Sequence, residues 1–276
     1  METGQSSKNR FSFRMVLLGS RSVGKTSVVN TILGFKEGEE GKRTGHSMKH
    51  QGVVGTTKIS VVDTPGWWKE FSAYDTPEAI KDEVKRSVFL CPPGPHVFLL
   101  VIDADTAFNG RHLKAVTTHL ELLGDAVWKH TIVVFTRGDW LESHTIEQHI
   151  EGEGEALQSL SEHRPLLELV EKCNNRYHVI NNLKKHDTTQ VTELRRQIKN
   201  QMRQQMEQEI SRRKHEWLIH SRDVFLDLQA DLRGSAPRAK PKLQSEYFTV
   251  VYMCVFWNCT GFLLLFGKTS LNEMYS

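Results

Sequence analysis

The segment from Gly19 to Thr26 restricts the fold of this chain more than any other part of its sequence. Its residues, GSRSVGKT, match the pattern GxxxxGK[ST] in full. The segment follows a short apolar run, Phe13 to Leu18, and opens a stretch with helical spacing, Lys25 to Leu33. A glycine-rich loop between a strand and a helix is the setting in which this pattern binds phosphate. Its glycines permit a tight turn, and its backbone N–H groups and the helix start bind phosphate oxygens.

We expect this loop to hold the phosphates of a nucleotide. Lys25 is expected to reach the β- and γ-phosphates, and Thr26 to supply an oxygen ligand to Mg²⁺. The candidate contacts are Gly19, Ser20, Arg21, Ser22, Val23, Gly24, Lys25, Thr26 and Ser27.

The rest of the sequence fits a fold in which strands and helices alternate. Short apolar, β-branched runs recur along the chain, separated by longer amphipathic stretches. The runs are Phe13 to Leu18, Ile59 to Val62, Val97 to Ile102, Thr131 to Phe135 and Tyr177 to Ile180. This alternation predicts an α/β fold with a mostly parallel, doubly wound sheet. Ligands of such sheets bind at the carboxyl ends of the strands, and the motifs of this chain fall at those ends.

A second motif, Asp63-Thr64-Pro65-Gly66, directly follows the second apolar run. An acidic residue at a strand end can hold the hydration shell of Mg²⁺, which is the role we expect for Asp63. Gly66 offers a backbone N–H that can approach the γ-phosphate closely because glycine lacks a Cβ. DTPG alone is a common turn, but its position after a P-loop favours the functional interpretation.

The segment TRGD, which follows the fourth apolar run, is the candidate reader of the base. One carboxylate, Asp139, can accept hydrogen bonds from both N1–H and the 2-amino group of guanine. Adenine lacks that pair of donors, so Asp139 disfavours an ATPase. Thr136 and Arg137 belong to the same segment, and the stem of Arg137 can cover the base plane. Asn181 and Asn182 follow the fifth run and are either supports for the base carbonyl or turn residues.

Together these motifs resemble the immunity-associated (GIMAP) branch of the septin-like GTPases. The resemblance rests on GSRSVGKTS from Gly19, VVDTPGWW from Val61, GPHVFLLVI from Gly94, HTIVVFTRGDWL from His130 and RYHVINN from Arg176. It implies a Ras-like domain with added C-terminal helices that binds GTP and GDP with Mg²⁺ and hydrolyses GTP slowly. It also implies nucleotide-dependent association with a second copy or with related GTPases.

The same resemblance implies a threonine in the first switch segment that contacts the metal ion. Its distance from Asp63 places this residue near Thr44, so the expected metal ligands are Thr26, Thr44 and Asp63.

Two departures from related enzymes leave the catalytic residue unassigned. Ras-like enzymes place a water-orienting glutamine directly after DxxG, and this chain has Trp67 there. Where some relatives carry a basic residue after the fourth strand, this chain has Asp103 to Thr106, and Arg111 is a weak substitute. Two hypotheses therefore stay open: a slow or dimerisation-dependent GTPase, and a nucleotide-gated membrane scaffold with little hydrolysis.

The composition changes after Thr189. Apolar residues recur three or four positions apart amid many Arg, Gln and Glu side chains, which predicts an amphipathic helix. They are Val191, Leu194, Ile198, Met202, Met206 and Ile210. This helix is expected either to pack on the G domain or to form a coiled coil. We predict a G domain over residues 10–205, an amphipathic helix and basic linker over 206–245, and a transmembrane tail over 246–268.

The stretch from Tyr247 to Gly267 has no charged side chain and is long enough to cross a bilayer. Basic residues precede it, which favours a cytosolic position for that side. We therefore expect the cytoplasmic face of an intracellular membrane, or the cytosol if the tail is not inserted. The formal net charge of the 276 residues is only +3, so we expect no nucleic-acid partner.

Overall fold

The structure is a computed structural model of the whole chain, and it describes residues 12–35, 44–141, 144–152, 164–184 and 187–234. Residues 235–245 of the predicted helix-and-linker segment, and the whole predicted tail over 246–268, lie outside the described residues. The chain divides into two compact units, residues 1–202 and 203–276, and the division falls inside the last helix.

A six-stranded sheet forms the centre of the first unit, with the strand order β2-β3-β1-β4-β5-β6. The strands are β1 Ser12–Leu18, β2 Met48–Val54, β3 Thr57–Asp63, β4 Val97–Asp103, β5 Thr131–Thr136 and β6 Tyr177–Val179. All neighbours pair in parallel except β2, which runs antiparallel to β3. The mostly parallel sheet predicted from the sequence is therefore confirmed, and β2 is the strand that the apolar runs did not indicate.

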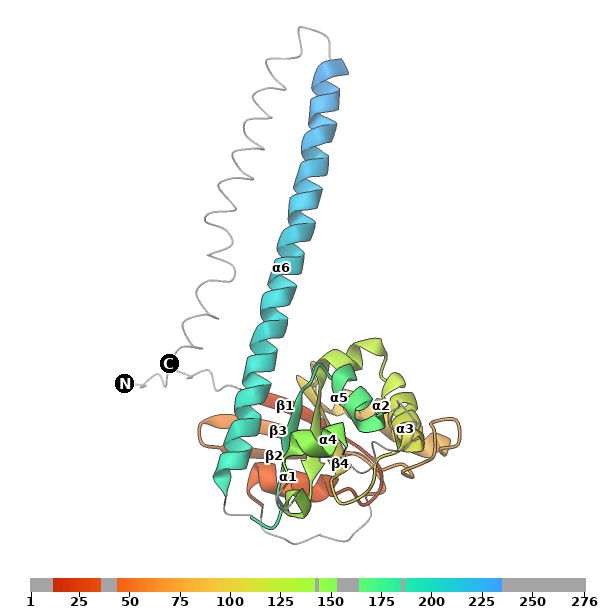
Figure 1. Cartoon of the computed structure of the whole chain (residues 1–276). Coiled ribbons are helices and arrows are strands. Elements are labelled where there is room, and N and C mark those ends of the chain that lie inside the picture. The colour runs from red at the N-terminus through yellow and green to blue at the C-terminus, as the bar shows by residue number, and fades with distance from the viewer. Residues whose placement is uncertain (1–11, 36–43, 142–143, 153–163, 185–186, 235–276) are drawn as a thin grey trace, which may run out of the picture. The chain divides into compact units, whose positions relative to one another are not determined.

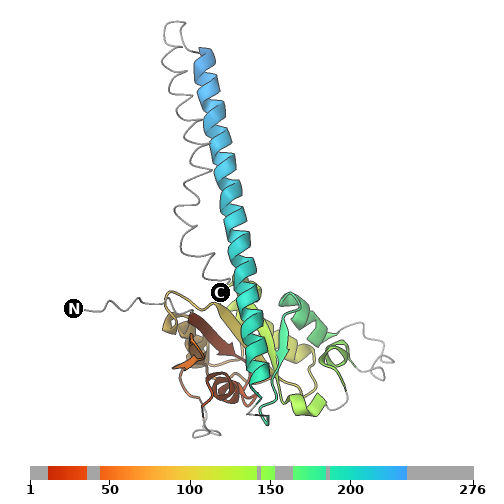
Figure 2. The ribbon, with the colours of Figure 1, turned by 90° about the vertical axis from the view of Figure 1, so that its left-hand side faces the viewer.

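Helices cover both faces of this sheet (Figures 1 and 2). The α-helices are α1 Lys25–Leu33, α2 Glu78–Ser87, α3 Gly110–Glu121, α4 Ile146–Glu151, α5 Pro165–Lys172 and α6 Thr188–Gly234. Short 3-10 helices are η1 Val88–Leu90, η2 Asp125–His130 and η3 Gly138–Leu141.

The central strand β1 supplies buried side chains to both faces, because successive residues of a strand point in opposite directions. Val16 and Leu18 pack in a core with residues of α2, α3, α4 and α5. Met15 and Leu17 pack in a second core with residues of α1 and the start of α6. Since β1 is buried on both sides, the loop that follows it starts from a rigid support.

The start of α6 packs on the sheet. Leu194 and Ile198 are buried in the second core, and Val191 is buried nearer the start of the helix. Arg195 donates to Thr57 Oγ1 at 2.8 Å, and Gln201 donates to the Lys129 carbonyl at 3.0 Å. Packing on the G domain, one of the two alternatives for the amphipathic helix, is thus present at its start.

The part of α6 in the second unit carries several exposed apolar side chains. Ile210 is 39% exposed and Leu218 is 46% exposed. Arg212 pairs with Glu209 and Glu216 along the same helix. Among the residues that the structure describes, no helix is both long enough and apolar enough to cross a membrane. The coiled coil stays a prediction.

Candidate nucleotide-binding site

The P-loop joins β1 to α1 and takes a backbone path that requires glycine at two positions. Gly19 has a φ of 150°, and a Cβ there would lie 2.5 Å from the carbonyl oxygen of Val101. Gly24 precedes α1 with a φ of 89°. Thr136, at the end of β5, donates to the Val23 carbonyl at 2.7 Å and so ties the loop to that strand. The loop is therefore fixed by its own backbone and by contacts with β4 and β5.

Lys25 is buried and lies across this loop. Its ammonium donates to the carbonyl oxygens of Gly19 at 3.0 Å and Ser20 at 2.8 Å. Burial lowers the pKa of Lys25 to about 8, while the nearby charge of Asp63 acts in the opposite direction. A buried ammonium held only by neutral carbonyls is stabilised by any anion brought next to it, as expected for a phosphate-binding lysine.

The three predicted metal ligands meet at one carboxylate oxygen. Thr26 Oγ1 donates to Asp63 Oδ2 at 2.7 Å, and Thr44 Oγ1 donates to the same oxygen at 3.2 Å. Asp63 is only 2% exposed, and its Oδ1 has no hydrogen-bond partner among the described residues. Two hydroxyl oxygens beside a buried carboxylate with one free oxygen form a donor set that suits Mg²⁺.

Gly66 lies against the P-loop so closely that no side chain fits. A Cβ at this position would lie 2.6 Å from the backbone nitrogen of Arg21 and 2.7 Å from Lys25 Nζ. The next residue joins the two segments, because the Arg21 N–H donates to the Trp67 carbonyl at 2.7 Å. The backbone of DTPG therefore stands directly beside the loop, as the predicted contact with a γ-phosphate requires.

These groups surround a cleft of about 480 Å³. The P-loop lines the cleft with Arg21, Ser22, Gly24, Lys25, Thr26 and Ser27. The first switch segment adds Thr44 and Gly45, and the DTPG segment with the residues after it adds Thr64, Pro65, Gly66 and Trp68. A cleft of this size suits a small ligand with a few polar contacts. The phosphate and metal candidates are thus brought together in one place.

The TRGD segment follows β5 and leaves Asp139 exposed in η3. Arg137 has a φ of 57°, and Gly138 is packed so tightly that a Cβ would lie 2.6 Å from Val179 Cγ1. Its N–H donates to the Ile180 carbonyl at 3.3 Å, which holds the segment beside the end of β6. The carboxylate of Asp139 is thus exposed to solvent, and the turn that carries it is held in place by the contacts of Gly138 with β6.

The two asparagines after β6 make local contacts. Asn181 Oδ1 accepts from the backbone N–H groups of Leu183 at 2.9 Å and Lys184 at 3.3 Å. Asn182 Oδ1 accepts from Thr31 Oγ1 at 3.0 Å, a contact with α1. Their oxygens act here as turn and packing groups, which was the alternative interpretation of these residues. Contact with the base stays a prediction.

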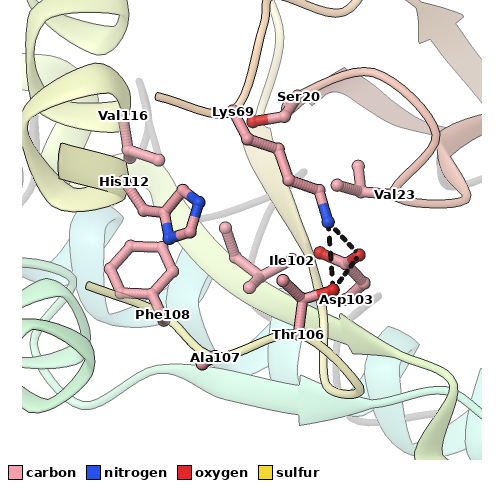
Figure 3. Close-up of a pocket in the computed structure, with 10 residues that line it drawn as sticks. All are labelled: Ser20, Val23, Lys69, Ile102, Asp103, Thr106, Ala107, Phe108, His112 and Val116. Carbon is pink, nitrogen blue, oxygen red and sulfur yellow. Dashed lines mark hydrogen bonds and ion pairs between the residues drawn. The ribbon is translucent and has the colours of Figure 1, made fainter. Parts of the chain in front are cut away.

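Two acidic residues, one at the end of β4 and one in the loop after it, pair with cations that flank the site. Asp105 pairs with Arg137 of the TRGD segment. Asp103, which is buried, pairs with Lys69, and Thr106 joins them at 3.1 Å from the ammonium (Figure 3). Sequence reasoning missed both pairs because each joins segments far apart along the chain. The acidic character of this loop was their only visible signal.

The tryptophan in the glutamine position is part of the core. Trp67 is 1% exposed and stacks on His119, with ring centroids 4.3 Å apart and planes 8° apart. Trp68 is half exposed, with the guanidinium of Arg21 lying 4.3 Å from its ring centroid. Arg111 is exposed at the start of α3 and lies 3.4 Å from Glu70. The structure therefore gives Trp67 a packing role, not a catalytic one.

Comparisons with known proteins place these features in a family. The immune-associated nucleotide-binding protein 7 of Arabidopsis thaliana is 33% identical over 156 residues, covering 54% of this chain and 49% of that protein. The human GTPase IMAP family member 8 is 29% identical over 194 residues, covering 68% of this chain and 27% of that protein. The chain thus spans about half or less of the length of these relatives. A crystal structure of Toc33 from Arabidopsis thaliana with GDP and Mg²⁺ is 19% identical, with a TM-score of 0.47, and covers 63% of this chain and 72% of that one.

Residues 13–225, well over half of the chain, match the model of the AIG1 family. Since the P-loop, DTPG and TRGD segments all lie in that range, this chain belongs to the AIG1 family and carries a GTP-binding P-loop G domain.

Proposed function

We propose that this protein binds GTP and GDP with Mg²⁺, hydrolyses GTP slowly as a single chain and hydrolyses it faster when two G domains associate. The observation that carries the proposal is the meeting of Thr26, Thr44 and Asp63 at one carboxylate oxygen, next to the buried Lys25. One of these residues, Thr44, comes from a segment that in GTPases responds to the γ-phosphate. This arrangement therefore supports a nucleotide switch as well as simple nucleotide binding.

Each candidate residue has a defined task in this proposal. Lys25 would neutralise the β- and γ-phosphates, and the Gly66 N–H would bind a γ-phosphate oxygen. Thr26 and Thr44 would supply oxygens to Mg²⁺, and Asp63 would hold its hydration shell. When bound, Mg²⁺ neutralises negative charge on the phosphates.

The slow rate follows from the position of Trp67. An indole packed on His119 cannot orient a water molecule for attack on the γ-phosphate. Two cations that flank the site, Lys69 and Arg137, are each paired with an aspartate of the same chain. The guanidinium of Arg21, which lines the cleft, donates to the Gly66 carbonyl at 3.2 Å and lies over the Trp68 ring. A second G domain is therefore the natural source of a further charged group.

The same observations favour a second candidate, a nucleotide-gated membrane scaffold in which GTP controls assembly and is hardly hydrolysed. Its distinguishing feature is a turnover rate that stays low at every protein concentration. The two candidates share the nucleotide site and differ only in what association does to it.

Steady-state GTP turnover per molecule, measured with the full-length protein in detergent over a wide range of protein concentrations, separates the two candidates. We expect the rate per molecule to rise with concentration, in step with the mass of the GTP-bound species in light scattering. A turnover rate that stays very low at all concentrations although the protein assembles would favour the scaffold candidate over the GTPase candidate. Lys25→Ala is the matched control, because it removes the phosphate-binding ammonium and should abolish both responses.

A further inference from the structure

The segment that follows Thr44 is fastened to helix α2 through one residue, Glu83. The backbone N–H of Ser47 donates to Glu83 Oε2 at 2.6 Å, and Ser47 Oγ donates to the Glu83 carbonyl at 2.9 Å. His46 Nδ1 lies 3.1 Å from Glu83 Oε1. Ser47 is buried, at 6% exposure. Both carboxylate oxygens and the carbonyl of Glu83 thus bind two consecutive residues of the first switch segment.

The charge of Glu83 is well stabilised in this position. Burial raises the pKa of its carboxyl group, but hydrogen bonds from Ser47 and His46 and the nearby charge of Arg86 lower it more, to about 2. Arg86 Nη1 lies 3.1 Å and 3.3 Å from the two carboxylate oxygens. The carboxylate is therefore ionised throughout the physiological range, and its bond to the Ser47 N–H is a charge-assisted one.

This fastening determines where Thr44 can lie. On the other side of Ser47, strand β2 begins, and its first residue, Met48, is in register with Asp63 of β3. Thr44 is connected to these fixed points by only two residues, Gly45 and His46. Its hydroxyl is 3.2 Å from Asp63 Oδ2, which is a long and hence weak hydrogen bond. That bond alone holds the segment weakly, so the hydrogen bonds to Glu83 of α2 contribute much of what keeps the segment in place.

We propose that Glu83 is a positioning residue for the GTP-bound state: it fixes residues 46 and 47 on α2, holds Thr44 beside Asp63, and thereby raises the affinity for GTP but not for GDP. The inference rests on the proposed function, in which the segment of Thr44 responds to the γ-phosphate, a group that GDP lacks. Lys25 and Asp139 serve both nucleotides, so they do not depend on this attachment. Glu83 acts through Thr44 and touches no nucleotide itself.

The test compares two glutamates of the same helix in the full-length protein. Glu83→Gln removes the charge that binds the first switch segment. Glu78→Gln is the matched control, because Glu78 pairs with Lys81 and Lys85 on the exposed face of α2. Affinities for GDP and for the nonhydrolysable analogue GMPPNP are measured by calorimetry, with Mg²⁺ and with EDTA.

We expect Glu83→Gln to weaken binding of GMPPNP with Mg²⁺ by about tenfold, the size expected for a lost charge-assisted hydrogen bond. Affinity for GDP should change less than about twofold, and the control variant should match the wild type. Without Mg²⁺ the difference between Glu83→Gln and wild type should largely vanish. A residue with only a structural role would not show this dependence on Mg²⁺.

Ser47→Ala provides a second variant that leaves the carboxylate in place. It removes only the hydroxyl bond to the Glu83 carbonyl, and should give a smaller loss of the same kind. Equal weakening of GDP and GMPPNP in the Glu83 variant, or no weakening of either, would overturn the inference while leaving the proposed function intact. A wild-type chain that binds neither nucleotide would overturn the proposed function, and this inference with it.

Discussion

At the scale of single residues, the phosphate end of the site depends on backbone contacts as much as on charges. Gly66 and Gly19 lie so close to neighbouring backbone atoms that a Cβ at either position would clash with them. The ammonium of Lys25 donates to two carbonyl oxygens of the P-loop. A phosphate next to this ammonium would bind it more strongly than a neutral carbonyl does, and would favour the protonated form of Lys25.

We predict that nucleotide binding at pH 8 takes up about half a proton through Lys25. Burial holds the pKa of Lys25 near 8 in the free protein, so about half of the molecules carry the charge at that pH. Phosphates raise this pKa, so the charged form is favoured on binding and affinity falls as the pH rises above 8. Calorimetry of GDP binding in two buffers with different ionisation enthalpies measures the uptake. Equal heats in both buffers would contradict the prediction.

A second residue-scale prediction concerns the base. Asp139→Asn replaces an acceptor pair by an amide, which presents a donor toward the N1–H and 2-amino groups of guanine. Affinity for GTP should fall about 100-fold, the cost of losing a bidentate charged contact, and affinity for XTP should rise because xanthine has a carbonyl at position 2. Competition binding with both nucleotides measures the change. Intact GTP binding in the variant would show that TRGD does not read the base.

The parts of the site that could be predicted from the sequence are those made by residues close together in it. GSRSVGKT and DTPG each specify a backbone path and a charge within a few residues. The partners of Lys69 and Arg137 could not be predicted, because Asp103 and Asp105 reach them only after β4 has been placed beside β1 and β5. Thr44 was located by its distance from Asp63, and the contact with Glu83 that holds its segment depends on where α2 packs.

At the scale of elements, the segment of residues 63–76, which begins with DTPG, joins the P-loop to helix α3. Trp67 stacks on His119 of α3, whose pKa is lowered by burial, so a neutral ring faces the indole. His119 lies 2.7 Å from the Ala115 carbonyl and 3.0 Å from Thr76 Oγ1, which fixes the ring. The Ala73 N–H donates to Thr118 Oγ1 of the same helix at 2.9 Å. Several contacts thus anchor this segment on α3.

From this packing we predict that Trp67→Gln does not restore catalysis of the Ras type. The new side chain would point into the core, and the protein would lose at least about 3 kcal/mol of unfolding free energy from the cavity and the buried amide. Trp68→Gln is the matched control, since Trp68 is half exposed and loses only its contact with Arg21, about 1 kcal/mol or less. Urea unfolding and GTP turnover of both variants test this. A rise in turnover for Trp67→Gln would show that position 67 can face the nucleotide.

The elements themselves were predictable in proportion to how completely they are buried. Strands β1, β4 and β5 are buried almost throughout and appear as continuous apolar runs. Strand β2 lies at the edge of the sheet and has no buried residue, and its sequence MKHQGVV contains no long apolar run, so it gives little signal. Its place is set by pairing with β3, a long-range property that short patterns do not contain.

At the scale of the whole molecule, the G domain is followed by a helix and by the stretch from Tyr247 to Gly267. That stretch was predicted as a membrane anchor and lies outside the described residues. We propose that it holds the protein on the cytoplasmic face of an intracellular membrane. An uncharged stretch of this length can satisfy its backbone hydrogen bonds as a helix within the bilayer.

We predict that the full-length protein fractionates with membranes and resists carbonate extraction. Truncation after Ser245 should make it soluble without changing its affinity for GTP, because the nucleotide site lies within residues 19–139 and the asparagines after β6. Fractionation of the two forms, with GTP binding measured for each, tests this. Recovery of the full-length chain as a monodisperse species without detergent would rule out the anchor.

The shared acceptor at Asp63 has a consequence for how the site would bind a metal ion. Two threonine hydroxyls already point their oxygens toward one carboxylate, and the other carboxylate oxygen is free of partners among the described residues. To receive a cation, both hydroxyls need only turn their hydrogens away, while their oxygens stay in place. The oxygens that would hold the ion therefore need little rearrangement, so ordering them costs little of the binding free energy.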